Sequence, residues 1–175
     1  MRVTRLGLSK DRLAASTLAG AAAPLTSWPN DFVVAGYAAM GAELDPTPLL
    51  ERLTARGARV VLPVVIARSA PLIFREAGLS SAYQPDAAGI GAPPPWAQAL
   101  RPDLILAPLL AFDRFGGRLG QGGGYYDRTI RALRVAGPLQ VVGFAFAGQE
   151  VERVPMDEQD ERLDAILTEK GYSEL

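Results

Sequence analysis

Short apolar runs alternate with stretches of helical spacing along most of the chain. The apolar runs are rich in Val, Ile, Leu and Ala, and they predict strands buried on both faces of a sheet. These runs are residues 31–40, where the strand is expected at the start, 58–66, 104–107 and 139–147, with a last strand-like run at 163–169. Helical spacing predicts helices at residues 9–25, 46–57 and 125–134.

The order of these elements predicts an α/β fold with three layers. The helix at 46–57 lies between two apolar runs, and parallel strands need such a crossover, so this part predicts a βαβ unit. A short strand is expected around Phe74, whereas residues 87–96, AAGIGAPPPW, are rich in Gly and Pro and predict a loop. No internal repeat or long linker divides the chain, so we expect one domain over residues 1–175.

A glycine-rich loop follows the apolar run 104–107, which Pro108 ends. Gly116 and Gly117 predict a turn, Arg118 supplies a fixed cation, and four glycines between 120 and 124 permit close backbone approach to a ligand. The helix at 125–134 comes next, so its first N–H groups and this loop together predict an anion site. Such a loop could instead be a flexible hairpin, and it matches neither the P-loop nor the dinucleotide fingerprint.

Composition and charge narrow the classes of function. The chain is 49% hydrophobic and 21% charged with a formal net charge of −1, which is typical of a globular protein and does not favour nucleic acid as a partner. No apolar segment reaches transmembrane length, and the N-terminus lacks the apolar core of a secretory signal. We therefore expect no membrane partner and a cytoplasmic location.

Cysteine and histidine are both absent from the chain. Their absence excludes disulfides, Cys/His zinc sites, thiolate nucleophiles and imidazole bases. Carboxylates, arginines, backbone amides and a hard cation such as Mg²⁺ remain. That set suits phosphoryl transfer, in which positioning and charge stabilisation supply most of the acceleration.

Two stretches carry a specific resemblance. The run RLGQGGGYYDR at 118–128, preceded by LAFDRFG at 110–116, resembles the signature of the 5-formyltetrahydrofolate cyclo-ligase family, and VPMDEQDERLDAILTE at 154–169 resembles its closing motif. The resemblance covers the chain from about Arg5 to Gly171. It implies a mixed, mostly parallel sheet related to the phosphosugar isomerase and CoA-transferase folds. It also implies ATP-dependent cyclisation of 5-formyltetrahydrofolate to 5,10-methenyltetrahydrofolate, with ATP and Mg²⁺ as cofactors.

The resemblance implies a role for each of several residues. Arg118 and Asp127 would be catalytic, and the ATP site would comprise Arg118, Leu119, Gly120, Gln121, Gly122, Gly123, Gly124, Tyr125 and Tyr126. Mg²⁺ would be held by Asp127 and Asp160. The folate would contact Glu43, Tyr126 and Trp96 or Ile90. Alternatively, Glu43 is a solvated loop acid and residues 87–96 are only a connector.

The sequence departs from the family pattern at several positions. Gln121 replaces an aromatic or basic residue, Ala92 a glutamate and Gln159 a histidine. The KxxLR helix that holds ATP phosphates in the family lacks its lysine, so Arg2 or Arg5 replaces it, the true start lies upstream, or activity is weakened.

Two further classes of function stay open at this point. The chain could be a fold relative that isomerises a phosphosugar or transfers CoA and binds an anion at the same loop without consuming ATP. It could also be a catalytically impaired folate- or nucleotide-binding protein. For the cyclo-ligase, the expected partners are 5-formyltetrahydrofolate and ATP, and we expect a monomer.

Overall fold

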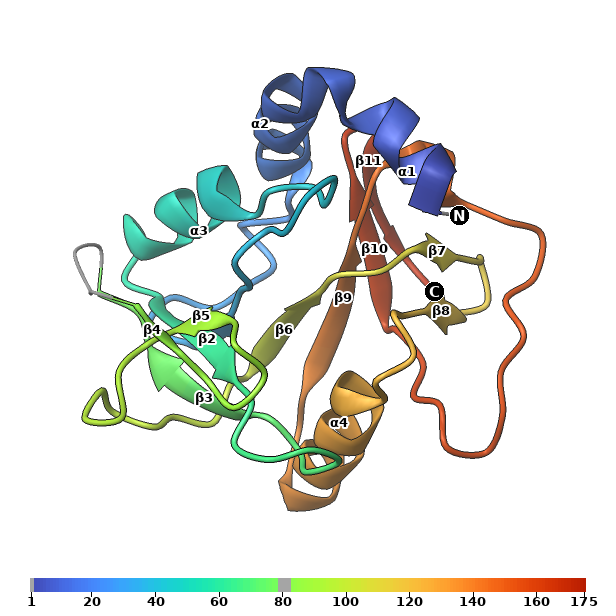
Figure 1. Cartoon of the computed structure of the whole chain (residues 1–175). Helices are drawn as coiled ribbons and strands as arrows, with labels where there is room; N and C mark the ends of the chain where they lie inside the picture. Colours follow the sequence, from blue (N-terminus) through green and yellow to red (C-terminus); the bar gives the residue numbers. More distant parts are fainter. Residues whose placement is uncertain (1, 79–82) are drawn as a thin grey trace.

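The computed structural model describes residues 2–78 and 83–175, and a single large sheet runs through them (Figure 1). In spatial order its seven strands are β11 (Gly171–Glu174), β10 (Ala165–Thr168), β9 (Gln140–Phe144), β6 (Leu104–Ala107), β1 (Val33–Ala35), β2 (Arg59–Val64) and β3 (Ile73–Glu76). The strands from β10 to β2 are parallel, and both edge strands are antiparallel to their neighbours. The prediction of a mixed, mostly parallel sheet is confirmed.

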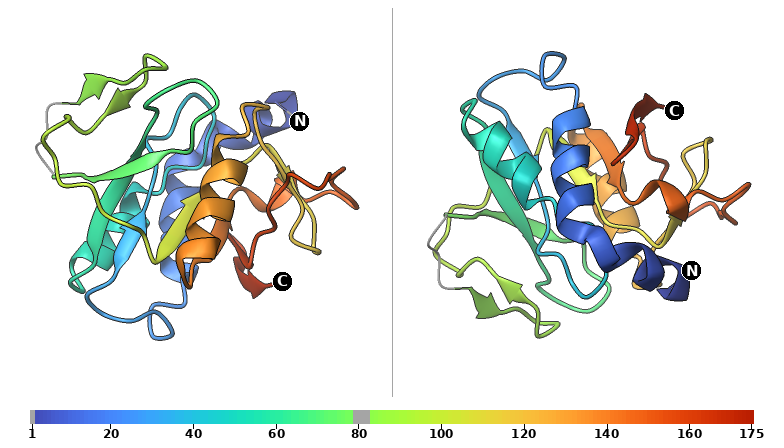
Figure 2. Two further views of the ribbon diagram at one scale, coloured as in Figure 1. Left: turned by 90° about the horizontal axis from the view of Figure 1, so that it is seen from below. Right: turned by 90° about the horizontal axis from the view of Figure 1, so that it is seen from above.

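Helices cover both faces of the sheet, which gives the three predicted layers (Figure 2). The helices are α1 (Arg2–Leu8), α2 (Arg12–Ala22), α3 (Thr47–Thr54) and α4 (Tyr125–Ala136), with short 3-10 turns at η1 (Ser9–Asp11) and η2 (Ala147–Gln149). Leu49 and Leu53 of α3 pack with Leu106 and Leu167 on one face. Ile130 of α4 packs on the opposite face with Ile105, among other residues.

Most strands and helices lie where the apolar pattern predicts them, and several are shorter than predicted, whereas β6 has the predicted bounds and α4 continues to Ala136. The largest difference is at residues 31–40, where only Val33–Ala35 form a strand paired on both sides. The chain then leaves the sheet, so that Tyr37, Met40 and Glu43 stand beyond the carboxyl end of β1. The early end of this strand therefore makes room for the site described below.

Two small hairpins were not predicted. β4 (Gln84–Pro85) lies just before the expected loop and pairs with β5 (Gly91–Ala92) inside it, and β7 (Ala111–Phe112) pairs with β8 (Arg118–Leu119) around the expected glycine turn. Strands of two residues are too short to show an alternating pattern in sequence. No helix within the described ranges is both long and apolar enough to span a bilayer.

Buried Asp113 fixes the β7–β8 hairpin that carries Arg118. Its Oδ1 accepts the N–H groups of Phe115 at 2.8 Å and Gly117 at 2.9 Å, and its Oδ2 accepts that of Val154 at 2.8 Å. Burial alone would raise the pKa of Asp113, but these hydrogen bonds favour the charged form and hold the pKa below its ordinary value.

Replacing Asp113 by asparagine tests this role. The Asp113→Asn side chain keeps one acceptor oxygen but turns a donor toward an N–H group, so we expect a loss of roughly 1–3 kcal/mol in unfolding free energy near pH 7. A depressed pKa gives stability that is present above the unfolded-state value and is lost as pH falls. The difference between the variant and the wild type should therefore shrink below about pH 4. Urea unfolding at pH 7 and pH 3 measures both effects, and a difference independent of pH would contradict them.

Candidate functional site

The sheet has a point at which its crossovers diverge. β1 and β6 are parallel neighbours, and β1 leads through α3 to β2 on one side while β6 leads through α4 to β9 on the other. The two crossover helices lie on opposite faces, so the loops after β1 and β6 separate and leave a crevice at the carboxyl edge. Ligands of α/β proteins bind in such crevices.

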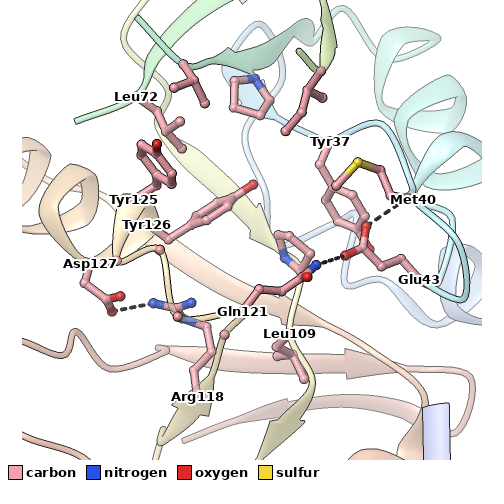
Figure 3. Close-up of a pocket in the computed structure, with 18 of the residues that line it drawn as sticks. Tyr37, Met40, Glu43, Leu72, Leu109, Arg118, Gln121, Tyr125, Tyr126 and Asp127 are labelled. Carbon is pink, nitrogen blue, oxygen red and sulfur yellow. Dashed lines mark hydrogen bonds and ion pairs between the residues drawn. The ribbon is translucent and has the colours of Figure 1, made fainter. Parts of the chain in front are cut away.

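A cavity of about 520 Å³ opens at this edge (Figure 3). Its size is that of a typical small-molecule site. One part of the wall is apolar and includes Met40, Leu62, Val65, Leu72, Ile90 and Leu109. Charged side chains line the rest, namely Arg5, Glu43, Asp86, Arg118, Asp127 and Asp160. The cavity thus offers an apolar surface for a ring system together with both signs of charge.

Glu43 lies at one end of the cavity and is buried, with 4% of its surface exposed. Its Oε1 accepts hydrogen bonds from Arg5 at 3.4 Å and from the side-chain amide of Gln121 at 3.2 Å. Its Oε2 accepts the N–H of Met40 at 3.0 Å. The alternative of a solvated loop acid therefore does not describe Glu43, which is a buried carboxylate held by an ion pair.

Arg118 and Asp127 form the second ion pair of the cavity, visible in Figure 3. Arg118 lies on β8 and is only 7% exposed, whereas Asp127 lies in the first turn of α4 and also accepts the N–H of Glu161 at 3.2 Å. A carboxylate in this turn is favoured by the positive end of the helix dipole. The two charges neutralise each other in the protein alone, and each is available to a ligand of opposite charge.

Three tyrosines also line the wall, and two of them, Tyr37 and Tyr126, are held as neutral groups. Burial raises the pKa of Tyr126, and Arg118, whose guanidinium lies 5.8 Å from the Tyr126 ring centroid, lowers it only in part. Burial, followed by the charge of Glu43, raises the pKa of Tyr37, whose hydroxyl donates to the carbonyl of Leu44 at 2.5 Å. Both phenols therefore act as hydrogen-bonding surfaces and not as bases near neutral pH.

The glycine loop runs along the cavity and ends at α4. Gly122 has a φ of +89°, and Gly124, the N-cap of α4, has a φ of +62°. Such angles favour glycine because a Cβ would be strained there. The first N–H groups of an α-helix have no partner within the helix, so those of α4 lie beside the loop as donors for an anion.

Two buried guanidinium atoms support an anion at this place. The Nε atoms of Arg5 and Arg118 are buried, and neither has a hydrogen-bond partner within the described ranges. Both side chains also line the cavity, and a guanidinium pairs well with an anionic group, so an anion in the cavity would suit them. The residues thus fit a triphosphate, with α4 and Arg118 at one end and Arg5 at the other.

A cation of the Mg²⁺ type fits two carboxylates of the same wall. Asp127 and Asp160 both line the cavity, and Asp160 accepts the N–H of Asp157 at 2.8 Å. The described residues contain no group of three or more acidic, His or Cys side chains able to hold a metal. Mg²⁺ usually takes one or two carboxylates and completes its shell with phosphate oxygens and water, so two aspartates are compatible with it.

Most residues singled out in the sequence meet in this one cavity. Glu43, Asp160 and the whole stretch from Arg118 to Asp127 line it, although Gln121 turns its side chain toward Glu43. Ile90 also lines it, whereas Trp96 does not and is 76% exposed.

The expected contact of Trp96 with the folate is therefore wrong, because Trp96 does not line the cavity. Arg75 of β3 donates to the carbonyl of Ala97 at 2.8 Å and forms a bridge with Ala99, which fixes this segment along the outer edge of the sheet.

Sequence reasoning gave too little weight to Arg5 and did not find Asp86. Arg5 was considered only as a substitute for a missing lysine, yet it contacts Glu43 and the carbonyl of Leu109, at 3.3 Å. Asp86 accepts the N–H of Val65 at 2.9 Å and orders the turn before Ile90. The turn sequence QPD at 84–86 was the signal that could have pointed to Asp86.

The side chain of Arg2, the other candidate for the lysine's place, lies outside the described part of the chain.

Comparison with known proteins agrees with the geometry. A model of the 5-formyltetrahydrofolate cyclo-ligase family matches residues 3–169. The chain is 38% identical over 140 residues to 5-formyltetrahydrofolate cyclo-ligase from Escherichia coli (strain K12), covering 77% of this chain and 76% of that protein. It is 34% identical over 167 residues to the protein of the same name from Mycolicibacterium smegmatis, covering 86% and 83%.

Solved structures show the same fold. The NMR structure of Aquifex aeolicus 5,10-methenyltetrahydrofolate synthetase matches with a TM-score of 0.74 at 29% identity and covers 97% of this chain and 86% of that one. The 5,10-methenyltetrahydrofolate synthetase from Mycoplasma pneumoniae matches with a TM-score of 0.73 at 24% identity, covering 94% and 92%. Since the family model spans nearly the whole sequence and curated relatives exceed 30% identity over most of it, the chain belongs to the 5-formyltetrahydrofolate cyclo-ligase family.

Proposed function

We propose that this protein converts 5-formyltetrahydrofolate and ATP, with Mg²⁺, to 5,10-methenyltetrahydrofolate, ADP and phosphate. The observation that carries the proposal is the cavity itself, which combines a glycine loop at a helix N-terminus, two buried arginines and a buried glutamate. The first two features suit the phosphates of a nucleotide. The glutamate and the apolar wall suit a reduced pterin, whose ring carries adjacent N–H donors.

The reaction needs ATP because a formamide oxygen is a poor leaving group. In the proposed sequence that oxygen attacks the γ-phosphorus of ATP, an O–P bond forms, and the bond to ADP breaks. N10 of the folate then attacks the activated formyl carbon, a C–N bond forms, N10 loses its proton, and phosphate leaves from the carbon. Both steps depend on alignment of two bound substrates in one site.

The side chains of the cavity have separate tasks in this scheme. Arg118 and the amides of Gly122 to Gly124 would neutralise charge on the transferring phosphoryl group, and Arg5 would contribute from the other end. Glu43 would orient the pterin, with Tyr126 beside it. Asp127 and Asp160 would hold Mg²⁺, which when bound neutralises phosphate charge. The Arg118–Asp127 pair would then open so that each partner meets its ligand.

The other classes of function lack a specific observation in their favour. The family model and the curated relatives favour a cyclo-ligase over an isomerase or a CoA transferase. An impaired binding protein would follow from the missing lysine, but Arg5 already brings a buried guanidinium to this wall. We therefore propose an active enzyme.

A direct assay tests the proposed function. The protein is mixed with 5-formyltetrahydrofolate, ATP and Mg²⁺, and formation of the methenyl product is followed by its absorbance. We expect product only when all three are present, with one ADP formed per product. ATP-independent conversion, or none with folded protein, would contradict the proposal.

The proposed metal role predicts the behaviour of Asp127→Asn. This nearly isosteric change removes a charged ligand, and the loss of a charge-assisted contact should raise the Mg²⁺ concentration for half-maximal rate by roughly ten- to a hundredfold. The initial rate is measured against Mg²⁺ concentration. Asp11→Asn, at an exposed site in η1, is the matched control and should behave as wild type. An unchanged Mg²⁺ curve in folded Asp127→Asn would remove Asp127 from the metal site.

The glycine loop predicts a separate effect on the nucleotide. Gly122→Val places a β-branched residue at a φ of +89° in an exposed loop, so the backbone should shift away from its phosphate-binding shape. Strain of this kind costs about 1–3 kcal/mol, and the affinity for a non-hydrolysable ATP analogue should fall by at least roughly fivefold. Calorimetric titration measures this fall. Gly171→Val, at another positive φ but in the β10–β11 turn, should be strained without loss of nucleotide affinity.

A further inference from the structure

A hydrogen bond crosses the cavity and joins its two halves. Gln121 belongs to the glycine loop, whereas Glu43 follows β1, and the side-chain amide of Gln121 donates to Oε1 of Glu43 at 3.2 Å. Figure 3 shows the Gln121 side chain pointing to Glu43 and away from the Arg118–Asp127 pair. The loop expected to bind phosphate is thus tied to the carboxylate expected to bind the pterin.

The hydrogen-bonding capacity of Glu43 is nearly filled at Oε1. Each carboxylate oxygen has about two acceptor positions, and Oε1 already accepts from both Arg5 and Gln121. Oε2 accepts one hydrogen bond, from the N–H of Met40, among the described residues. A 2-amino-4-oxopteridine presents two adjacent donors, its ring N3–H and its 2-amino group, which together need one position on each oxygen. One donor to Oε1 must therefore leave when such a ring binds.

Arg5 and Gln121 differ in what their departure costs. Removing Arg5 would leave a buried carboxylate without its cation, which is strongly unfavourable, and Arg5 is also anchored by the carbonyl of Leu109. Gln121 instead offers a neutral amide from an exposed residue flanked by Gly120 and Gly122, so its departure from Glu43 leaves no buried charge without its counter-ion. The ring donors thus displace Gln121 and not Arg5.

We propose that Gln121 is a latch on Glu43, which closes the pterin end of the cavity in the substrate-free protein and is displaced when the folate binds. This inference rests on the proposed function, since it takes the reduced pterin as the ligand of Glu43. Displacement also releases the glycine loop from the β1 side of the cavity. Gln121 is therefore a positioning residue that belongs to the folate end of the site, although its backbone lies in the phosphate loop.

The latch predicts a gain of affinity on mutation, which general damage to the site would not give. Gln121→Met keeps the length of the side chain and removes its amide, so the folate no longer has to break that hydrogen bond. We expect 5-formyltetrahydrofolate, titrated calorimetrically without nucleotide, to bind the variant about two- to tenfold more tightly than wild type. Gln84→Met, on β4 and outside the cavity lining, is the control and should leave the affinity unchanged.

The outcomes separate the latch from the proposed function. Equal or weaker folate binding by folded Gln121→Met would overturn the latch. Glu43→Gln is titrated in parallel and tests the pterin contact itself, which should weaken at least about tenfold because a charge-assisted pair is lost. If Glu43→Gln leaves folate affinity unchanged, the proposed folate contact fails. If Glu43→Gln weakens binding and Gln121→Met does not tighten it, only the latch fails.

Discussion

The site depends on one constraint, the parallel pairing of β1 with β6 at the point where the crossovers diverge. Because the two following helices lie on opposite faces, the segments after these strands cannot close over each other, and a crevice remains between them. Glu43 reaches the crevice from β1, and Arg118 reaches it from the hairpin after β6. The chemistry of the cavity is therefore assembled from segments far apart in sequence.

Two ion pairs, one buried and one partly buried, balance the charges that line this crevice. A single buried charge is strongly unfavourable, so Arg5 with Glu43 and Arg118 with Asp127 compensate each other at the two ends of the cavity. A ligand can take over one partner of the Arg118–Asp127 pair, whereas Arg5 stays paired with Glu43. At the Arg118 end, binding of an anion would replace one partner of a guanidinium that is already buried, so little further desolvation of Arg118 is needed.

Local patterns predicted the elements whose signal lies within a few residues. Periodicity predicted the apolar run 104–107 and the helix after the glycine loop, and glycine content and the motif at 118–128 predicted the loop itself. The structure brings these elements together at the cavity. The sequence did not predict which residues far apart in the chain contact each other. Nothing near Trp96 shows that Arg75 holds the following segment at the sheet edge, and nothing near Arg5 shows that it meets Glu43.

Other expectations stay predictions because they depend on more than the folded chain. This group includes a relation to the phosphosugar isomerase and CoA-transferase folds, a single domain, a monomeric state and a cytoplasmic location. The roles of Asp127 and Asp160 toward Mg²⁺ also belong here, since the position of two carboxylates establishes compatibility and not occupancy.

The most direct test of this account is an experimental structure with ADP and 5-formyltetrahydrofolate bound together. The central claim is that both ligands occupy the crevice between β1 and β6, with the phosphates against Gly122 to Gly124 and the pterin at Glu43. The account predicts both ligands in that one cavity, with the Glu43 carboxylate on the pterin. Nucleotide phosphates bound away from the N-terminus of α4, or a pterin without contact to Glu43, would contradict it.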